Sequence, residues 1–217
     1  AKNEPETDAQ GEIVQATQGE TVQATQAETN ATAETEAPAS SGQYPNIVVI
    51  MNEAFSDLSV WGDFATSEEV MPFFKSLQQE AVGGELYVSV KGGNTANTEF
   101  EFLTGDTMGF LPKGSIPYQQ YILKDTPSLA SLLREEGYET RAFHPGELTS
   151  WQRNQAYPLL GFDSFKCGED MNVPQTMEHG YVSDQSDFEQ IIWEFEHKEE
   201  GQPLFLFNVT IQNHGSY

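Results

Sequence analysis

Two short, continuous apolar runs constrain this chain more than any other feature. Asn46–Met51 reads NIVVIM and Pro203–Thr210 reads PLFLFNVT. Runs of this length without alternating polar residues are typical of strands that are buried on both faces of a parallel sheet. Between them, further patterns predict strands at 85–90 and 138–143, and helices at 71–81, at 127–137 and from Asp184 onward. This alternation predicts an α/β fold, with a largely parallel central sheet and helices on both faces.

Apolar spacing also predicts which side of each helix is buried. The 71–81 helix is expected to pack in the core. The 127–137 helix begins with a proline suited to a first turn and places Leu129, Leu132 and Leu133 on one face. Asp184 is expected to cap a helix whose apolar stripe is Phe188, Ile191, Ile192 and Phe195.

The first 43 residues differ from the rest in composition. They contain no aromatic residue, and VQATQGET at Val14 is echoed by VQATQAET at Val22. Such a segment cannot bury enough apolar surface to offset its ordering entropy. We therefore expect residues 1–43 to be a disordered linker rich in Thr, Gln, Glu and Ala, and residues 44–217 to fold.

Charge restricts the possible partners. The net charge is −24, and residues 1–43 carry eight acids and Lys2, which leaves −17 for the folded part. A surface this acidic argues against nucleic acid as a partner. Any anionic substrate would need a local positive centre, such as a metal ion or a few basic groups. Cys167 is the only cysteine, so an intrachain disulfide is excluded, and no run of 18 apolar residues could span a membrane.

Four polar residues follow predicted strands: Glu53, Thr95, His144 and His214. Ligands of open α/β sheets collect at the carboxyl ends of the strands, so these residues are expected to share one site. Each also has a structural interpretation. Thr95 could simply cap a helix, Glu53 could be a solvated loop carboxylate, and either histidine could be a hydrogen-bonded, partly buried imidazole.

Thr95 has the context of a phosphate-handling nucleophile. It follows Lys91, two glycines and Asn94 and opens a helix that ends at Gly105. A helix N-terminus carries unpaired N–H groups and a partial positive charge, and so attracts phosphate or sulfate. A threonine hydroxyl needs a base or a metal to become nucleophilic, and Glu53 could share Mg²⁺ or Mn²⁺ with it. The sequence shows no convincing pair of further metal ligands.

Basic and aromatic residues could bind the rest of a phosphorylated substrate. His144, Arg153 and His214 could give hydrogen bonds and charge to phosphate oxygens, and Arg can do so through two N–H groups. Either histidine could instead protonate a leaving group. Trp151 is interpreted as core or as a pocket wall, which would suit a glycerol or sugar group.

Several segments together resemble the extracellular domain of lipoteichoic acid synthases, which are phosphoglycerol transferases of the sulfatase and alkaline-phosphatase superfamily. They are NIVVIMNEAF, MPFFKSLQQEAVGG, GGNTANTEFEFLTG, AFHPGELTSWQRNQAYPLLGFDSF, GYVSDQSDF and PLFLFNVTIQNHGSY. The resemblance covers residues 44–217. It implies an alkaline-phosphatase-like fold of which this chain is the N-terminal portion, incomplete at the C-terminus.

The resemblance also implies roles. Thr95 would be the nucleophile that takes phosphoglycerol from phosphatidylglycerol, and Glu53 and Thr95 would bind one Mn²⁺ or Mg²⁺ ion. His144, Trp151, Arg153 and His214 would line the glycerol phosphate pocket. The acceptor would be a glycerol phosphate polymer. The chain itself would be soluble and would work on the extracellular face of the membrane of a Gram-positive-type bacterium, attached through segments outside this sequence.

Two departures from the family leave other functions open. The family completes its metal site with an Asp-His pair well beyond the segment that ends at His214, whereas this sequence ends at Tyr217. The C/S-x-P-x-R pattern of sulfatases proper is absent at NTANTE, which disfavours sulfuric ester hydrolysis. The alternatives are a phosphodiesterase or phosphatase, and a non-catalytic surface module that binds anionic glycerol phosphate polymer.

Overall fold

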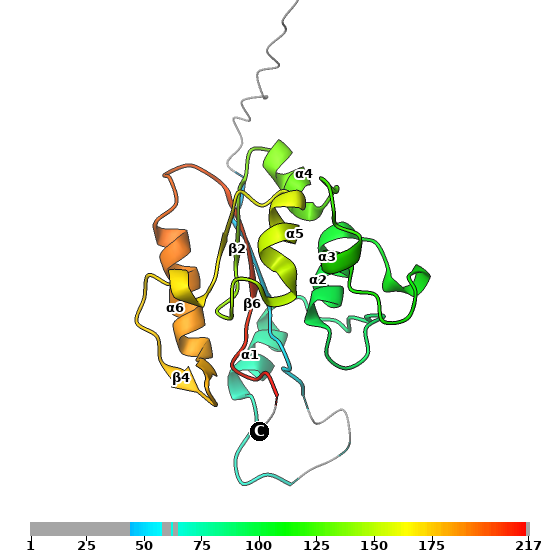
Figure 1. The fold of residues 1–217 in the computed structure, drawn as a ribbon. Helices are drawn as coiled ribbons and strands as arrows, with labels where there is room; N and C mark the ends of the chain where they lie inside the picture. The colour runs from blue at the N-terminus through cyan, green and yellow to red at the C-terminus, as the bar shows by residue number, and fades with distance from the viewer. Residues whose placement is uncertain (1–43, 58–61, 63–64, 216–217) are drawn as a thin grey trace, which may run out of the picture. The chain divides into compact units, whose positions relative to one another are not determined.

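A four-stranded parallel sheet forms the centre of the computed structural model, which describes residues 44–57, 62 and 65–215 (Figure 1). The expected linker at 1–43 lies outside the described residues. The strand order is β1-β6-β2-β3, with bounds β1 Ile47–Met51, β6 Leu204–Val209, β2 Glu139–Phe143 and β3 Ser164–Lys166. All three neighbouring pairs are parallel. Both apolar runs are therefore strands, and they pair with each other as the prediction of a parallel sheet requires.

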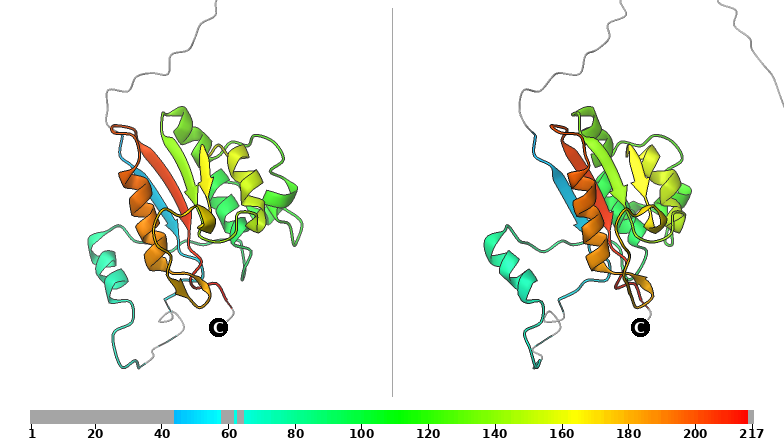
Figure 2. Two further views of the ribbon diagram at one scale, coloured as in Figure 1. Left: turned by 60° about the vertical axis from the view of Figure 1, so that its left-hand side comes forward. Right: turned by 90° about the vertical axis from the view of Figure 1, so that its left-hand side faces the viewer.

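Helices cover both faces of this sheet (Figure 2). α6 lies on one face, and α2, α4 and α5 lie on the other. The bounds are α1 Pro72–Glu80, α2 Thr95–Thr104, α3 Pro117–Gln120, α4 Leu129–Glu135, α5 Arg153–Leu159 and α6 Asp184–Glu196. Within the described residues, short 3₁₀ turns lie at Met108–Phe110, Ser150–Gln152 and Gly168–Asp170, and a small antiparallel hairpin pairs β4 Met177–Glu178 with β5 Tyr181–Val182. The predicted α/β class is confirmed.

β6 is the centre of the core, and all six of its residues are buried. Because side chains alternate along a strand, Phe205 and Phe207 point to the face covered by α2, α4 and α5, whereas Leu204 and Leu206 point to α6. Burying one such side chain contributes roughly 1.5–3 kcal/mol. The first face has the larger apolar cluster, which includes Ala96, Phe100 and Leu103 of α2. The helix that begins at Thr95 is thereby anchored to the sheet.

The helix predicted at 127–137 exists but begins later. Its N-cap is Ser128, whose hydroxyl accepts hydrogen bonds from the N–H groups of Ala130 at 3.0 Å and Ser131 at 3.2 Å. Pro127 thus precedes the cap and does not occupy the first turn. Leu132 is 58% exposed, so the predicted leucine face is buried only in part. The helix starts after Ser128 because a serine hydroxyl can accept hydrogen bonds from the unpaired N–H groups of the first turn. A proline side chain cannot accept such bonds.

Two predictions for the segment before Thr95 are wrong. Residues 85–90 form no strand, and Leu86 and Tyr87 are more than 80% exposed. A strand is stabilised by cross-strand hydrogen bonds, and no described strand pairs with these residues. The predicted helix at 71–81 does form as α1, but it buries none of its side chains and Phe73 is 74% exposed. Periodicity indicated an apolar face without showing what would cover it.

α6 is rotated relative to the predicted apolar stripe. Its N-cap is Ser183 and not Asp184. The buried residues of α6 are mainly polar: Ser186, Asp187, Gln190, Glu194 and only one apolar residue, Ile191. Phe188, Ile192 and Phe195 are 37–55% exposed. The reason lies in the strands beneath, which present polar partners to the helix.

Glu194 shows this polar packing most clearly. Its carboxylate accepts hydrogen bonds from Arg141 Nη1 at 2.7 Å and Lys166 Nζ at 2.6 Å. Deeper in the same interface, Asn208 Nδ2 donates to Asp187 Oδ1 at 2.7 Å. Buried polar groups must find partners, so these pairs fix the rotation of α6 against its apolar preference.

Candidate active site

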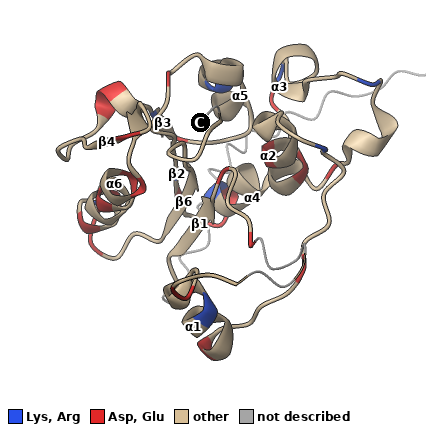
Figure 3. Cartoon of the chain, turned by 90° about the horizontal axis from the view of Figure 1, so that it is seen from below, with Lys and Arg blue, Asp and Glu red and all other residues tan. Residues whose placement is uncertain are grey.

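The loops after β1 and β6 are tied together at the carboxyl ends of their strands. Glu53 N–H donates to Thr210 Oγ1 at 3.0 Å, and Thr210 N–H donates to the Met51 carbonyl at 3.1 Å. Figure 3 looks onto this end of the molecule and shows acidic positions along α6 and near β4. The two bonds hold the backbone at Glu53 in place, so its side chain projects from a fixed point.

Glu53 and Thr95 are in direct contact. Thr95 Oγ1 donates to Glu53 Oε1 at 2.8 Å, across 42 residues of sequence. Thr95 is the first residue of α2, and the N-cap is Asn94, whose side chain makes no capping bond. Thr95 is therefore not a helix cap. Its hydroxyl lies at the positive end of the helix dipole and points to a carboxylate.

Backbone strain gathers around the same residues. Six non-glycine residues among those described have positive φ, and three of them, Ala54, Asn94 and Gln152, directly adjoin Glu53, Thr95 and Arg153. A fourth is Trp151, with φ 57°. Each such residue costs on the order of 1–3 kcal/mol and persists only where surrounding structure enforces it. Strain of this kind is common at functional sites, where it aims side chains.

His144 is buried and electrically neutral. Its Nδ1 lies 2.8 Å from the Val209 carbonyl oxygen, which can only accept, so Nδ1 carries the proton and Nε2 is an acceptor. Burial, reinforced by the nearby charge of Arg153, lowers the pKa of His144 to about 4. The expectation that His144 supplies positive charge is therefore wrong for the protein in this state. A Cβ on Gly146 would lie 2.6 Å from Nε2, so a larger residue at 146 would displace the imidazole ring.

Arg153 forms a buried ion pair with a residue that sequence reasoning missed, Glu99. Arg153 Nε is 3.1 Å from Glu99 Oε2, and Nη2 contacts Oε1. Tyr157 Oη donates to the same carboxylate at 2.8 Å. Burial alone would raise the pKa of Glu99, but Arg153 and Tyr157 outweigh it and the pKa is lowered. Both charges are thus maintained although the side chains are at most 1% exposed.

This pair connects the helix of Thr95 to the helix of Arg153. Glu99 lies one turn after Thr95 on α2, and Arg153 opens α5. Two nitrogens of Arg153, Nε and Nη2, are bonded to Glu99. The third, Nη1, lies 3.4 Å from the Ser150 carbonyl oxygen. The signal in the sequence was an acidic residue one turn after Thr95, directly before Phe100, which is buried on the same helix.

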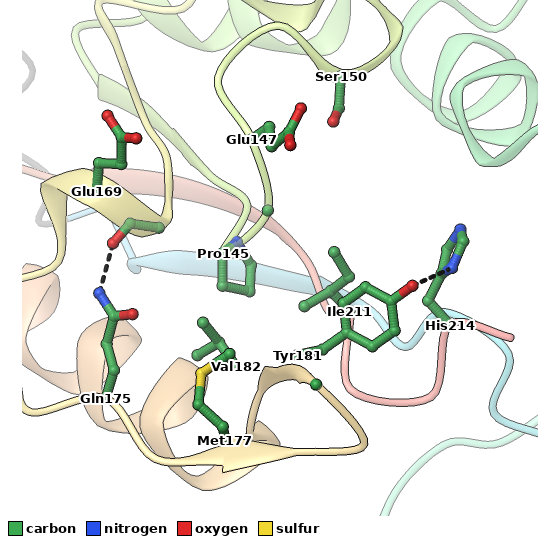
Figure 4. Close-up of a pocket in the computed structure, with 13 residues that line it drawn as sticks. Pro145, Glu147, Ser150, Glu169, Gln175, Met177, Tyr181, Val182, Ile211 and His214 are labelled. Atoms are coloured by element: carbon green, nitrogen blue, oxygen red, sulfur yellow. Dashed lines mark hydrogen bonds between the residues drawn. The ribbon is translucent and has the colours of Figure 1, made fainter. Parts of the chain in front are cut away.

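His214 completes the group at the surface. Its Nε2 is 3.9 Å from Glu53 Oε1, its Nδ1 is 3.3 Å from the hydroxyl of Tyr181, and its side chain is 49% exposed (Figure 4). Tyr181 is a second residue that the sequence did not single out, although it lies in the GYVSDQSDF segment. Trp151 is partly buried and packs against the main apolar cluster, which agrees with its interpretation as a core residue.

The structure thus brings Glu53, Thr95 and His214 together and places His144 and Arg153 deeper, with Arg153 bound to Glu99. Carboxylate and hydroxyl oxygens suit Mg²⁺ or Mn²⁺. Within the described ranges, no group of three or more His, Cys, Asp or Glu side chains is arranged to hold a metal. Glu53 and Thr95 therefore fit part of a divalent-cation site, and a complete site needs further ligands.

Comparison with known proteins decides the family. A family model described as Sulfatase matches residues 45–217. This chain belongs to the sulfatase family. The expected resemblance is confirmed at this level, and the fold agrees with solved members of the superfamily. None of the helices in the described ranges has the length and apolar character needed to cross a membrane.

Two solved structures share the fold of this sulfatase-family chain. Lipoteichoic acid synthase LtaP from Listeria monocytogenes aligns with a TM-score of 0.67 and 21% identity over 78% of this chain and 41% of that one. The phosphoglycerol transferase GacH of Streptococcus pyogenes, solved with sn-glycerol-1-phosphate, also has a TM-score of 0.67, with 22% identity over 78% of this chain and 45% of GacH.

Among curated proteins, a Rhizobium meliloti protein named for cyclic beta-1,2-glucan modification is 42% identical over 174 residues, which is 80% of this chain and 26% of that protein. The chain spans between about a quarter and a third of the length of the curated relatives it matches.

Proposed function

We propose that this sulfatase-family chain carries the nucleophile of a transferase. The enzyme moves a phosphoglycerol, or a similar phospho-alcohol unit, from a phospholipid such as phosphatidylglycerol to a hydroxyl of a cell-surface polymer. The observation that carries the proposal is the 2.8 Å hydrogen bond from Thr95 Oγ1 to Glu53 Oε1 at the N-terminus of α2. It combines a hydroxyl, an acceptor for its proton and a site that attracts phosphate.

In the first half-reaction Thr95 Oγ1 attacks the phosphorus of the donor. An Oγ1–P bond forms, and the bond from phosphorus to the diacylglycerol oxygen breaks. The hydroxyl proton leaves along the hydrogen bond to Glu53, and the departing diacylglycerol oxygen takes a proton from His214, which borders the pair at 3.9 Å from Glu53. Diacylglycerol departs and glycerol phosphate remains on Thr95.

In the second half-reaction an acceptor hydroxyl attacks the same phosphorus. A new O–P bond forms and the Oγ1–P bond breaks. The acceptor hydroxyl gives its proton to His214, and Glu53 returns its proton to Thr95 Oγ1, so all three groups regain their starting protonation. Glu53 and Thr95 would hold Mn²⁺ or Mg²⁺, which supplies stabilisation of the threonine alkoxide and polarisation of a phosphoryl oxygen. The remaining ligands of that ion lie outside the group described above.

The deeper residues serve the phosphate without reacting. Arg153 is permanently charged, because Glu99 raises its pKa further above its ordinary range. Glu99 balances this charge and the side chain is only 1% exposed, so Arg153 would contact a phosphate through Nη1 alone. The positive field that an anion needs in so acidic a protein would come from the N-terminus of α2 and from a bound cation. His144 stays neutral and presents Nε2 as an acceptor, for example to a hydroxyl of the glycerol unit.

The names of the related proteins support a phosphoglycerol transfer reaction. LtaP and GacH are named for lipoteichoic acid synthesis and phosphoglycerol transfer, and the Rhizobium relative for modification of a glucan. We place the reaction at the outer face of the cell membrane, where phospholipid donors and envelope polymers meet, with attachment through segments outside this chain.

Hydrolysis is the second candidate, because His214 is half exposed and the site is open to water. Water in place of the acceptor hydroxyl would make the protein a phosphodiesterase or phosphatase, while a sulfate ester would make it a sulfuric ester hydrolase. A non-catalytic surface module is a third candidate, and it predicts no turnover of any donor. Product analysis with and without a polymer acceptor separates the three.

The test uses the complete protein with labelled phosphatidylglycerol, a polymer acceptor and Mn²⁺. Thr95→Ala is expected to lower turnover by at least about a thousand-fold, since removing a nucleophile removes the covalent path. The matched control is Thr98→Ala, on the same helix and three residues further on, which should stay within a few-fold of wild type. Turnover that survives Thr95→Ala would rule out the nucleophile assignment.

A further inference from the structure

A pocket of about 470 Å³ has His214 among its lining residues (Figure 4). His214 Nε2 lies 3.9 Å from Glu53 Oε1, so this residue links the pocket to the Glu53–Thr95 pair. Loops after three parallel strands build it: the loop that follows β2, the turn after β3, and the loop from β6 to His214. The β4–β5 hairpin closes the remaining side. Its volume falls within the range of small-molecule sites. A molecule in this pocket would contact His214, which in turn borders Glu53, the hydrogen-bond partner of Thr95.

The floor of the pocket is rigid because two loop backbones meet there. Gly168 N–H donates to the Gly146 carbonyl at 3.1 Å, and a Cβ on Gly168 would lie only 2.5 Å from the Pro145 carbonyl oxygen. Gln175 Nε2 donates to the Gly168 carbonyl at 2.6 Å (Figure 4). A site whose backbone is fixed in this way needs little reorganisation to bind a ligand.

The chemistry of the walls excludes a polyanion. Glu147 and Glu169 contribute carboxylates, and Ser150 contributes a hydroxyl, whereas no Lys or Arg occurs among the described residues that line the pocket. Met177, Val182, Ile211 and the ring of Tyr181 make an apolar and aromatic part of the wall, and Gln175 and His214 are further polar lining residues. Two carboxylates with no Lys or Arg beside them disfavour phosphate groups in the pocket.

We propose that this pocket is the acceptor subsite of the transferase and that it takes a neutral, hydroxyl-rich carbohydrate. This inference rests on the function proposed above and narrows its acceptor from any cell-surface polymer, glycerol phosphate polymer included, to an uncharged glycan. Carboxylates accept hydrogen bonds from sugar hydroxyls, and the apolar face of a sugar ring packs on an aromatic side chain. Tyr181 supplies that ring and is itself hydrogen-bonded to His214.

The charge of the pocket also affects product release. A sugar enters without charge and leaves with one phosphodiester, which Glu147 and Glu169 repel. The substituted unit is thus expelled in favour of an unmodified one. Under this scheme the enzyme distributes phosphoglycerol over separate sugar units and does not build a glycerol phosphate chain on one of them.

Binding tests the pocket independently of catalysis. The complete protein is titrated with a neutral β-glucan oligosaccharide, followed by saturation-transfer NMR. Glu169→Lys and Met177→Asp are expected to weaken binding by about tenfold or more, since each changes the wall that faces the sugar. The matched control is Glu200→Lys, an exposed acid outside the pocket, and should leave the affinity unchanged. Unchanged binding in both pocket variants, or none in wild type, overturns the inference.

A second experiment measures the transfer reaction and tests which acceptor the enzyme prefers. Wild type is expected to use the neutral glucan at least about ten times more efficiently, as kcat/KM, than a glycerol phosphate oligomer of similar length, and Glu169→Lys should reduce that preference about tenfold. A preference for the anionic oligomer in wild type overturns the inference. Failure to cleave phosphatidylglycerol at all refutes the proposed function instead, and the NMR result still decides whether the pocket binds carbohydrate.

Discussion

The two faces of the central sheet are built differently. The face under α2, α4 and α5 is a continuous aromatic and aliphatic core, at whose edge lies one buried ion pair, Arg153–Glu99. The face under α6 has an apolar cluster of only four buried residues and is otherwise held by polar pairs such as Asp187–Asn208. The first face presents the nucleophile, and the second sets the position of α6, whose first residue, Asp184, donates its N–H to Gln212 Oε1 at 2.7 Å in the loop that leads to His214.

The difference follows from what each face must do. α2 buries Ala96, Phe100 and Leu103, so close packing leaves Thr95 and Glu99 little freedom. Polar pairs fix α6 instead, and they do so only while Asp187 and Glu194 keep their partners. Catalytic geometry requires placement within a fraction of an ångström, which a packed core provides.

The largest effect is expected from breaking the ion pair on the packed face. Glu99→Gln leaves the Arg153 guanidinium buried without its counter-charge, and this should lower the free energy of unfolding by about 3–5 kcal/mol, measured by urea denaturation. Glu139→Gln is the matched control, since Glu139 pairs with Arg141 in a more exposed position, and should cost about 1 kcal/mol or less.

The double change Glu99→Leu with Arg153→Met separates charge from packing. Because it removes both charges together, it should recover part of the stability that Glu99→Gln loses. If Glu99→Gln proves as mild as Glu139→Gln, the two helices are not joined by this pair.

A pair of neighbouring isoleucines tests the rotation of α6. Ile191 is 7% exposed and Ile192 is 55% exposed. Ile191→Ala should cost about 2–4 kcal/mol, whereas Ile192→Ala should stay near 0.5 kcal/mol, roughly the range of surface substitutions. Thermal or chemical unfolding of the two variants gives the answer. Equal losses would mean that α6 sits on the stripe expected from its sequence.

Asp187 gives the polar face a pH dependence. Burial raises its pKa to about 8, so the folded protein keeps a proton that the unfolded chain loses near pH 4. Stability from this group is complete below pH 4 and is lost as the pH rises through 8. We expect wild type to lose on the order of 1–3 kcal/mol between pH 5 and 8 from this source, and Asp187→Asn to lack that slope. Parallel pH profiles of the two proteins would refute this account.

The sequence predicted the centre of the fold and the edge where the site lies. The apolar runs of β1 and β6 identified buried parallel strands, and the position of Glu53 directly after β1 placed it at the carboxyl edge of the sheet. These inferences succeeded because both depend on local pattern and on a general rule of α/β sheets. Thr95 was assigned to the same edge through a strand at 85–90 that does not form, so that reasoning does not account for its place beside Glu53. The contact between Glu53 and Thr95 spans 42 residues and needed the fold itself.

Other features could not be derived from local pattern. Periodicity indicated an apolar stripe on α6, but partners on the strands decided which side is buried. The exposed segment at 85–90 has strand composition and no described strand to pair with. Burial of the Arg153–Glu99 pair depends on two helices meeting, so the sequence showed an arginine suited to phosphate and did not show its partner.

Trapping the covalent intermediate tests the central claim most directly. The complete protein is mixed with phosphatidylglycerol in the absence of acceptor, quenched in acid and digested, and the peptide that contains Thr95 is analysed by mass spectrometry. The account predicts that Thr95 gains one glycerol phosphate unit with loss of water, and that a neutral glucan added before the quench removes it. Diacylglycerol release without any adduct on Thr95, or an adduct on another residue, would contradict it.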